Sequence, residues 1–208
     1  MKSKSYIGIS FIILIFGIWA VPKIIVKLNG NDLVVFGAAP KFELINQNNK
    51  KISNENYHGK VYVLEFFFST CPSICPIMNR NMVSIQNEFF GNPNFGIASI
   101  TINPKNDTPE VLKKHAQELG ATSVNWHFLT GDKEYIYGIA NKGFNIFAGE
   151  NSKVNGGFEH SGFFALIDKK GKIRCRKDES GNPIKYYDGL DNKSVNAIKE
   201  DIKLLLEE

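Results

Sequence analysis

Residues 61–76 read VYVLEFFFSTCPSICP, and this stretch decides the fold. Its first part, 61–68, is a run of apolar and aromatic residues that only Glu65 interrupts, which is typical of a strand buried on both faces. Its second part places Cys71 and Cys75 four positions apart, directly after the run. The stretch therefore predicts a buried strand that passes into a helix, with a pair of thiols at the junction.

The helix is predicted to begin near Cys75. Pro76 suits its first turn, where the missing N–H of proline costs no hydrogen bond. Apolar side chains then recur at helical spacing, at Met78, Met82, Ile85 and Phe89.

Strands and helices alternate along the rest of the chain, and a hairpin follows near its end. The expected strands cover 42–45, 61–68, 95–102, 126–131, 163–168 and 173–175, and the further expected helices cover 108–119, 133–143 and 194–208. Residues 149–157 are expected to form a loop. This order predicts a single α/β domain, a sandwich with a central mixed sheet flanked by helices.

The N-terminus carries a long uncharged segment. The 18 residues from 5 to 22 contain no charged side chain, and as a helix they would rise about 27 Å, close to the hydrocarbon thickness of a bilayer. We expect residues 1–27 to form one transmembrane helix that anchors a domain spanning 28–208. A cleaved secretory signal is the alternative, but residues 20–22 (AVP) make a poor cleavage site and the apolar segment is long for a signal core.

The distribution of charge sets the expected orientation. Lys2 and Lys4 precede the apolar segment, so the positive-inside rule leaves the N-terminus in the cytoplasm. We therefore expect a single-pass protein of the inner (cytoplasmic) membrane, with its soluble domain on the periplasmic or extracytoplasmic side. The formal net charge of +4 resides in residues 1–28, which hold four lysines and no acidic residue. The rest of the chain is balanced, which argues against binding to nucleic acid.

The cysteine pair can form a disulfide or bind a soft metal ion. Three cysteines are too few for a disulfide scaffold in an exported chain. A helix N-terminus at Cys75 favours the thiolate form. His160 comes just before a predicted central strand, and from there its ring could meet both cysteines at the edge of the sheet. Two thiolates and one imidazole suit Cu(I) and can hold Cu(II), whereas a structural zinc ion wants a fourth ligand.

Other titratable residues have plainer interpretations. His58, His115 and His127 are interpreted as surface or hydrogen-bonded residues, with His115 on a solvated helix face. Cys175 is interpreted as a lone, half-buried thiol. Glu65 interrupts the strand six residues before the first cysteine. It is either a buried acid that accepts a proton from a thiol or a strand carboxylate satisfied by a neighbouring donor.

Three motifs, in this order, resemble the signature of the Sco/SenC copper proteins. They are FFFSTCPSICP at 66–76, NPKNDTPEVL at 103–112, and EHS at 159–161 leading into FFALID at 163–168. The resemblance spans residues 38–204 and implies a thioredoxin-like fold tethered to a membrane. It also implies copper held by Cys71, Cys75 and His160, and a role in assembling the copper A centre of cytochrome c oxidase. The implied partners are the copper-binding subunit of that oxidase and a copper donor protein.

The resemblance has one departure. Asn103 stands where the family usually has an aspartate before proline, so a carboxylate near the site is missing at this position. None of the three implied copper ligands is lost with it.

Two functions follow from these residues. The first is a copper metallochaperone, and the second is a thiol–disulfide reductase that keeps the copper-binding cysteines of the oxidase reduced. Thioredoxins have two residues between their cysteines and a proline facing them. Here three residues intervene, and residues 157–162 contain a histidine and no proline, which favours metal binding.

Two other readings share the same residues. A peroxidase of the peroxiredoxin type needs a threonine three residues before its reactive cysteine, but Phe68 and Pro72 occupy those positions. A redox or copper sensor at the membrane surface would use the same site and differ only in its partner.

Overall fold

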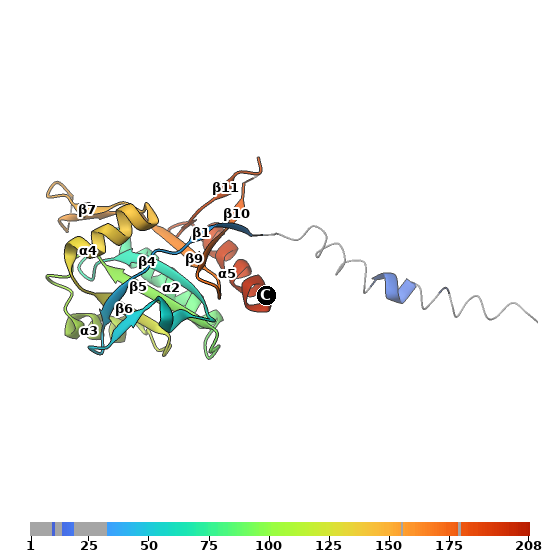
Figure 1. The fold of residues 1–208 in the computed structure, drawn as a ribbon, viewed down its shortest axis with the longest axis horizontal. Coiled ribbons are helices and arrows are strands. Elements are labelled where there is room, and N and C mark those ends of the chain that lie inside the picture. The colour runs from blue at the N-terminus through green and yellow to red at the C-terminus, as the bar shows by residue number, and fades with distance from the viewer. Residues whose placement is uncertain (1–9, 11–13, 19–32, 155, 179) are drawn as a thin grey trace, which may run out of the picture. The chain divides into compact units, whose positions relative to one another are not determined.

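The computed structural model describes residues 10, 14–18, 33–154, 156–178 and 180–208 (Figure 1). Most of the expected anchor, 1–27, lies outside these residues, so the anchor stays a prediction. No helix within the described part is long and apolar enough to cross a membrane. Leu33–Glu208 forms one compact unit, and this unit carries the three motifs found in the sequence.

A mixed sheet forms the centre of this unit, with the strand order β1-β10-β9-β4-β5-β6-β2-β3. In its middle, β4 (Val61–Phe67) and β6 (Trp126–Thr130) flank β5 (Phe95–Thr101) and run parallel to it. The other neighbours are antiparallel. These strands are β1 (Val34–Ala38), β2 (Glu43–Asn46), β3 (Lys51–Ser53), β9 (Phe163–Ile167) and β10 (Lys172–Lys177). The predicted mixed sheet is confirmed, and the apolar run that decided the fold lies inside it.

Six strands were not predicted. Two of them, β1 and β3, lie at the two ends of the strand order given above, and the other four are short. β11 (Pro183–Ile184) pairs with β10, and β12 (Tyr187–Asp188) pairs with β9. β7 (Ala148–Glu150) and β8 (Phe158–His160) form a separate antiparallel hairpin. The expectation of a plain loop at 149–157 was therefore wrong at its N-terminal end. Strands of two or three residues with glycine, proline and glutamate among them give no alternation of apolar and polar side chains that could signal them.

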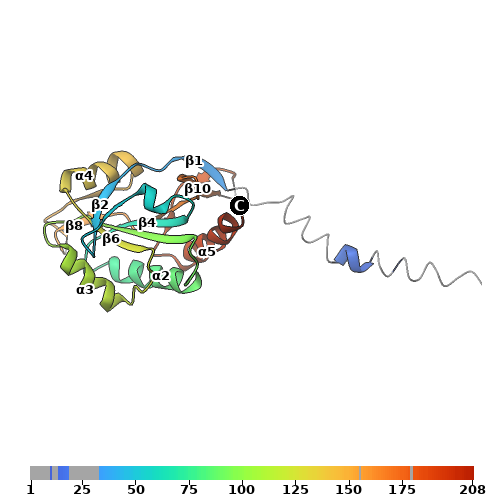
Figure 2. The same ribbon diagram turned by 60° about the horizontal axis from the view of Figure 1, so that its bottom comes forward.

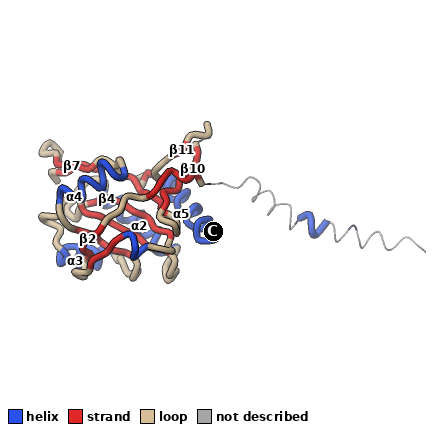
Figure 3. The backbone as a smooth tube through the Cα atoms, viewed as in Figure 1, coloured by secondary structure: helices blue, strands red, loops and turns tan. Residues whose placement is uncertain are grey.

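Helices cover both faces of the sheet (Figures 2 and 3). One face carries α2 (Cys75–Glu88) and α3 (Pro109–Leu119), with α5 (Asn192–Glu207) packed beside α2. The other face carries α4 (Lys133–Tyr137) and the π-helical segment η2 (Gly138–Phe144), while a short 3-10 helix, η1 (Asn54–Tyr57), follows β3. The helix predicted over 133–143 is thus two segments, because the hydrogen bonding changes to a π pattern after Tyr137.

Two adjacent residues of β4 show how the layers divide. The ring of Phe66 lies 6.0 Å from that of Phe144, whereas the ring of Phe67 lies 5.5 Å from that of His115 on α3. Successive side chains of a strand point to opposite faces of the sheet. The aromatic run of β4 therefore fills the core on both sides, which explains why it is apolar without alternation.

The helix boundaries follow the sequence signals. The Thr108 side chain accepts a hydrogen bond from the Val111 N–H at the start of α3, and Gly120 ends this helix with a left-handed φ of 77°. In α2 the spaced apolar side chains are buried, as predicted, with Met78 and Met82 wholly inaccessible. Both helices thus begin and pack as their sequences indicate.

An ion network joins β10 to α5. Arg176 donates from Nε to Asp201 Oδ2 at 2.6 Å and from Nη2 to Glu200 Oε2 at 2.6 Å. Tyr187 Oη also donates to Asp201 Oδ2. Asp201 is wholly buried, whereas the Glu200 side chain is 66% exposed. Cys175, next to Arg176, is fully buried, so the expectation of a half-buried thiol was wrong.

We predict that Asp201→Asn lowers the free energy of unfolding by about 2–4 kcal/mol, because the partly buried guanidinium of Arg176 then keeps only the exposed carboxylate of Glu200 as its counter-charge. Glu200→Gln, which changes the exposed partner of the same Arg176, should cost less than about 1 kcal/mol. Urea unfolding of both variants measures the difference. If both variants lost the same free energy of unfolding, the buried carboxylate of Asp201 would stabilise the contact between α5 and the sheet no more than the exposed carboxylate of Glu200, and the prediction would be wrong.

Candidate metal centre

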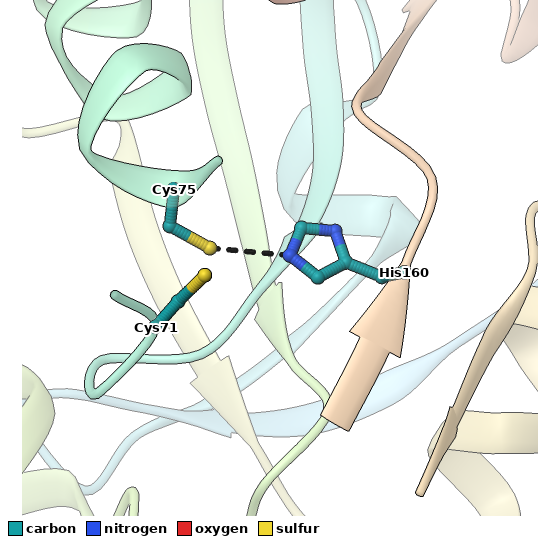
Figure 4. A group of neighbouring side chains, drawn as sticks. All are labelled: Cys71, Cys75 and His160. Carbon is teal, nitrogen blue, oxygen red and sulfur yellow. Dashed lines mark hydrogen bonds between the residues drawn. The ribbon is translucent and has the colours of Figure 1, made fainter. Parts of the chain in front are cut away.

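The structure brings Cys71, Cys75 and His160 together (Figure 4). Cys71 lies in the loop after β4, Cys75 is the first residue of α2, and His160 is the last residue of β8. The two Sγ atoms and a ring nitrogen all lie within 4.8 Å of one another, and Cys75 Sγ is 3.1 Å from His160 Nε2. Three soft or borderline donor atoms therefore face one point at the end of the central strand.

The sequence explains how the cysteines reach this point. β4 ends at Phe67, and the Cys71 N–H then donates to the Phe68 carbonyl at 3.2 Å, which closes a tight turn. α2 begins four residues later with Cys75, so its side chain is held in the first helical turn. Free backbone N–H groups and the helix dipole favour negative charge at this position.

The β7–β8 hairpin brings the histidine. The ring of Phe158 lies 5.3 Å from that of Phe68, and the ring of His160 meets Phe68 edge-on at 5.9 Å. Gly156 has a φ of 92°, and a Cβ atom on it would lie 3.0 Å from Pro72 Cδ. Glycine is required there because both the left-handed backbone and the close approach to the cysteine loop exclude a side chain.

The hydrogen bonds of His160 fix which nitrogen is free. Its Nδ1 lies 3.2 Å from the Ser161 carbonyl oxygen, which can only accept. We therefore assign the proton to Nδ1, which leaves the Nε2 lone pair facing Cys75. Metal-binding histidines are commonly oriented in this way, by a hydrogen bond from the other ring nitrogen to a carbonyl.

The two thiols differ in acidity and access. A hydrogen bond from Cys75 holds the pKa of Cys71 well below its usual range, and the backbone N–H groups of Cys75 and Ser73 act in the same direction. The same bond to Cys71, together with burial, raises the pKa of Cys75. The structure thus gives the thiolate character to Cys71 and keeps the Cys75 sulfur inside. The expectation that the helix N-terminus favours a thiolate at Cys75 was wrong, because burial and the bond to Cys71 outweigh it.

An open cleft of about 390 Å³ leads to the site. Its lining residues are Phe68, Cys71, Ser73, Ile74, Val154, Phe158, Glu159 and His160. Cys75 is absent from this lining, so a molecule in the cleft meets Cys71 and His160 first. Phe68, Ile74, Val154 and Phe158 supply the apolar part of its walls, and Ser73, Glu159 and His160 supply the polar part.

Glu65 lies wholly buried beneath the site. Ser99 Oγ donates to its Oε1 at 2.7 Å, and Trp126 Nε1 donates to Ser99 Oγ in turn. Within the described residues Oε2 has no hydrogen-bond partner. Burial raises the pKa of Glu65 to about 7, and its charge contributes to the raised pKa of Cys75. One observation supports each interpretation of Glu65. Ser99 is the neighbouring donor that a strand carboxylate needs, and the effect of Glu65 on the pKa of Cys75 is consistent with a role toward a thiol.

The remaining histidines stay apart from this cluster. His115 was expected on a solvated face, and that was wrong: its ring stacks on Phe67 at 5.5 Å, meets Phe128 edge-on, and burial lowers its pKa. Burial also lowers the pKa of His127, to about 4, and His58 is exposed. Among the described residues, Cys71, Cys75 and His160 form the one group of three potential metal donors that lies this close together.

The sequence did not single out Asp107, although it belongs to a quoted motif. The missing aspartate at position 103 was taken to remove a carboxylate from this region. The structure shows another carboxylate of the same motif, that of Asp107, wholly buried and hydrogen-bonded to Ser69 in the cysteine loop. A buried acid in a polar loop has no sequence signal, because aspartate is equally common in exposed turns.

Comparison with known proteins identifies the family. The SCO1/SenC family model matches residues 36–193. The SCO1 protein homolog of Bacillus subtilis is 31% identical over 168 residues, which cover 78% of this chain and 79% of that protein. The chain belongs to the SCO1/SenC family.

Solved structures agree with this assignment. A SCO1/SenC family lipoprotein from Bacillus anthracis matches with a TM-score of 0.72 at 28% identity, over 84% of this chain and 97% of that chain. BsSco is described as a member of the Sco family of cytochrome c oxidase assembly proteins with a disulfide switch. It matches with a TM-score of 0.67 at 30% identity, over 80% of this chain and 92% of that chain. Copper-bound yeast Sco1 matches with a TM-score of 0.60 at 24% identity, over 80% of this chain and 89% of that chain. This similarity supports the fold alone. The mixed sheet with its flanking helices is thus the thioredoxin-like fold of the Sco proteins.

The burial of Glu65 gives a prediction with a defined sign. Its pKa rises from 4.5 to about 7 on folding, so the folded chain holds the proton more tightly than the unfolded chain. Ionisation of Glu65 therefore lowers the free energy of unfolding. This loss is absent below pH 4.5, grows as the pH rises and is complete above about pH 7, at about 3 kcal/mol. Glu65→Gln removes the ionisation, so the variant should gain up to about 3 kcal/mol relative to the parent between pH 4 and pH 8.

Urea unfolding of the metal-free, reduced chain at the two pH values measures this gain. Glu43→Gln, which removes an exposed strand carboxylate, is the matched control and should show a much smaller change with pH. A stability difference between Glu65→Gln and the parent that stays constant with pH would show that Glu65 is not ionised in a buried environment.

Proposed function

We propose that this chain binds copper through Cys71, Cys75 and His160 and delivers it to the copper A centre of cytochrome c oxidase. The observation that carries the proposal is the convergence of these three donor atoms within 4.8 Å. Two thiolates and an imidazole are ligands that copper prefers over harder ions, and a three-donor set suits Cu(I) while also accepting Cu(II). Membership of the Sco family supports the same assignment.

The shape of the site supports transfer of the metal. All three side chains are largely buried, but Cys71 and His160 line the open cleft and Cys75 does not. A thiolate or imidazole of a partner protein that enters the cleft can bind the copper ion from this side. The partner then replaces the ligands of this chain one at a time, so the ion is never released into water.

The expected location and partners complete the proposal. We propose that residues 1–27 anchor the chain as a single span in the cytoplasmic membrane, and that the domain at 28–208 works on the extracytoplasmic side. The apolar segment at 5–22 supports the anchor. The description of BsSco as belonging to a family of oxidase assembly proteins supports the oxidase as recipient. A separate copper donor protein would load the site.

The second candidate is thiol–disulfide reduction, and the lowered pKa of Cys71 in an open cleft favours it. In this reaction the Cys71 thiolate attacks one sulfur of a partner disulfide, and the other sulfur leaves as a thiolate. Cys75 then loses its proton and attacks Cys71, which releases the second partner thiol. The chain ends with a Cys71–Cys75 disulfide and needs a thiol reductant to start again.

Copper titration of the reduced full-length protein tests the first candidate. We predict one copper ion per chain, and a loss of affinity of more than about 100-fold for Cys71→Ser, Cys75→Ser and His160→Ala, because losing a direct ligand costs more than losing a residue that only orients one. Competition with a Cu(I) chelator of known affinity gives the values. Cys175→Ala, which removes the buried thiol of β10, is the matched control and should bind as the parent does.

If His160→Ala binds copper as tightly as the parent, the three-ligand site is wrong. If the parent binds no copper but reduces a model disulfide with turnover in the presence of a thiol, the reductase function replaces the copper function.

A further inference from the structure

The side chain of Asp107 accepts four hydrogen bonds. It lies between β5 and α3 and is wholly buried. Its Oδ2 accepts from the Ser69 N–H at 3.0 Å and from the Thr101 hydroxyl, and its Oδ1 accepts from the Ser69 hydroxyl and from Asn106 Nδ2 at 2.8 Å. Four donors match the four lone-pair positions of a carboxylate. No salt bridge involves Asp107 within the described part of the chain, so these four donors are the hydrogen-bond partners that hold the carboxyl group in place.

Half of these bonds leave the loop of Asp107. Thr101 is the last residue of β5 and Asn106 lies in the connection between β5 and α3, whereas Ser69 lies in the loop between β4 and α2. Ser69 donates both its backbone N–H and its hydroxyl to Asp107. The carboxylate therefore joins two loops that are nearly 40 residues apart in the chain, and a buried charge of this kind persists only where every donor stays in place.

The loop that Asp107 holds is the one that carries Cys71. The Cys71 N–H donates to Phe68, so the turn has the last residues of β4 at one end and Cys71 at the other. Ser69 is the second residue of this turn. Hydrogen bonds from the β5–α3 connection reach this turn at Ser69: two go to Asp107, and a longer one of 3.3 Å comes from Asn106 Nδ2. The contact of Cys71 Sγ with Ser73 lies within the cysteine loop itself.

We propose that Asp107 is a positioning residue for the metal centre, acting through Ser69 to hold Cys71 where its sulfur meets Cys75 and His160. This inference rests on the proposed copper site, and it adds a residue that neither binds copper nor lines the cleft. Without the carboxylate the turn can take up other positions, and Cys71 is then in place for only a fraction of the time. Copper affinity falls by the same fraction.

The chain offers a matched pair of variants that separates positioning from general stability. Ser69→Ala and Thr101→Val each remove one hydroxyl donor to Asp107. Ser69→Ala breaks a bond between Asp107 and the cysteine loop. Thr101→Val breaks a bond between Asp107 and the end of β5, and leaves both bonds from Ser69 in place. Asp107→Asn weakens the bonds from both Ser69 and Thr101. One carboxylate oxygen becomes an NH₂ group, and its two N–H donors then face groups that are themselves donors.

The first readout is hydrogen exchange of the backbone amides of residues 69–71 in the reduced, metal-free chain. We predict that Asp107→Asn speeds this exchange at least about tenfold, as expected for the loss of about 1.4 kcal/mol or more of local stabilisation. Ser69→Ala should speed it by a smaller factor, and Thr101→Val should leave it within about twofold of the parent. If these amides exchange in Asp107→Asn as in the parent, Asp107 does not hold the turn and the proposal fails.

The second readout is copper binding by the same variants. Asp107→Asn should bind about 10- to 100-fold more weakly than the parent, the range found when a group that orients a metal ligand is removed. The sulfur-to-Cu(II) absorption band should shift in Asp107→Asn and Ser69→Ala and stay unchanged in Thr101→Val. An equal shift in both hydroxyl variants, or none in Asp107→Asn, would overturn the proposal. If the parent binds no copper the proposed function fails, whereas the exchange measurement still decides the role of Asp107.

Discussion

The contact between Cys75 Sγ and His160 Nε2, at 3.1 Å, is the interaction on which the site depends. It joins the first residue of α2 to the last residue of β8, two elements that the chain separates by 85 positions. Neither element could supply a metal site alone, since the helix offers only sulfur and the hairpin only nitrogen. The central strand β4 brings them together, because α2 follows its end and the hairpin packs on Phe68.

Two buried acids near the cysteine loop accept hydrogen bonds from hydroxyl groups. Glu65 accepts from Ser99, and Asp107 accepts from Ser69 and Thr101. Hydroxyl donors stabilise a carboxylate without adding a positive charge. Within the described residues neither carboxylate accepts a hydrogen bond from a lysine or arginine, so its donors add no positive charge that would repel a cation in the proposed site.

Much of the fold could be predicted from the sequence, for reasons that are local. The run of β4 is apolar on both faces, the spaced methionines of α2 mark its buried side, and Thr108 and Gly120 mark the ends of α3. The three potential ligands were also predicted, because thiols and imidazole are rare and chemically distinctive. Their convergence could be inferred only from the expected meeting of loops at the sheet edge.

The features that escaped prediction depend on tertiary contacts. The β7–β8 hairpin has strands too short for a period, yet it orients His160. His115 lies among polar neighbours in sequence, but the aromatic rings of Phe67 and Phe128 cover it in space. Asp107 looks like an ordinary turn residue until the cysteine loop folds over it. In each case the deciding partner lies far along the chain.

X-ray absorption spectroscopy at the copper edge, on the full-length protein loaded with one equivalent of Cu(I), tests the central claim most directly. A site built from Cys71, Cys75 and His160 predicts two sulfur neighbours and one nitrogen neighbour around the copper ion. A first shell with a single sulfur, or with no imidazole scattering, would show that these three residues do not hold the metal together.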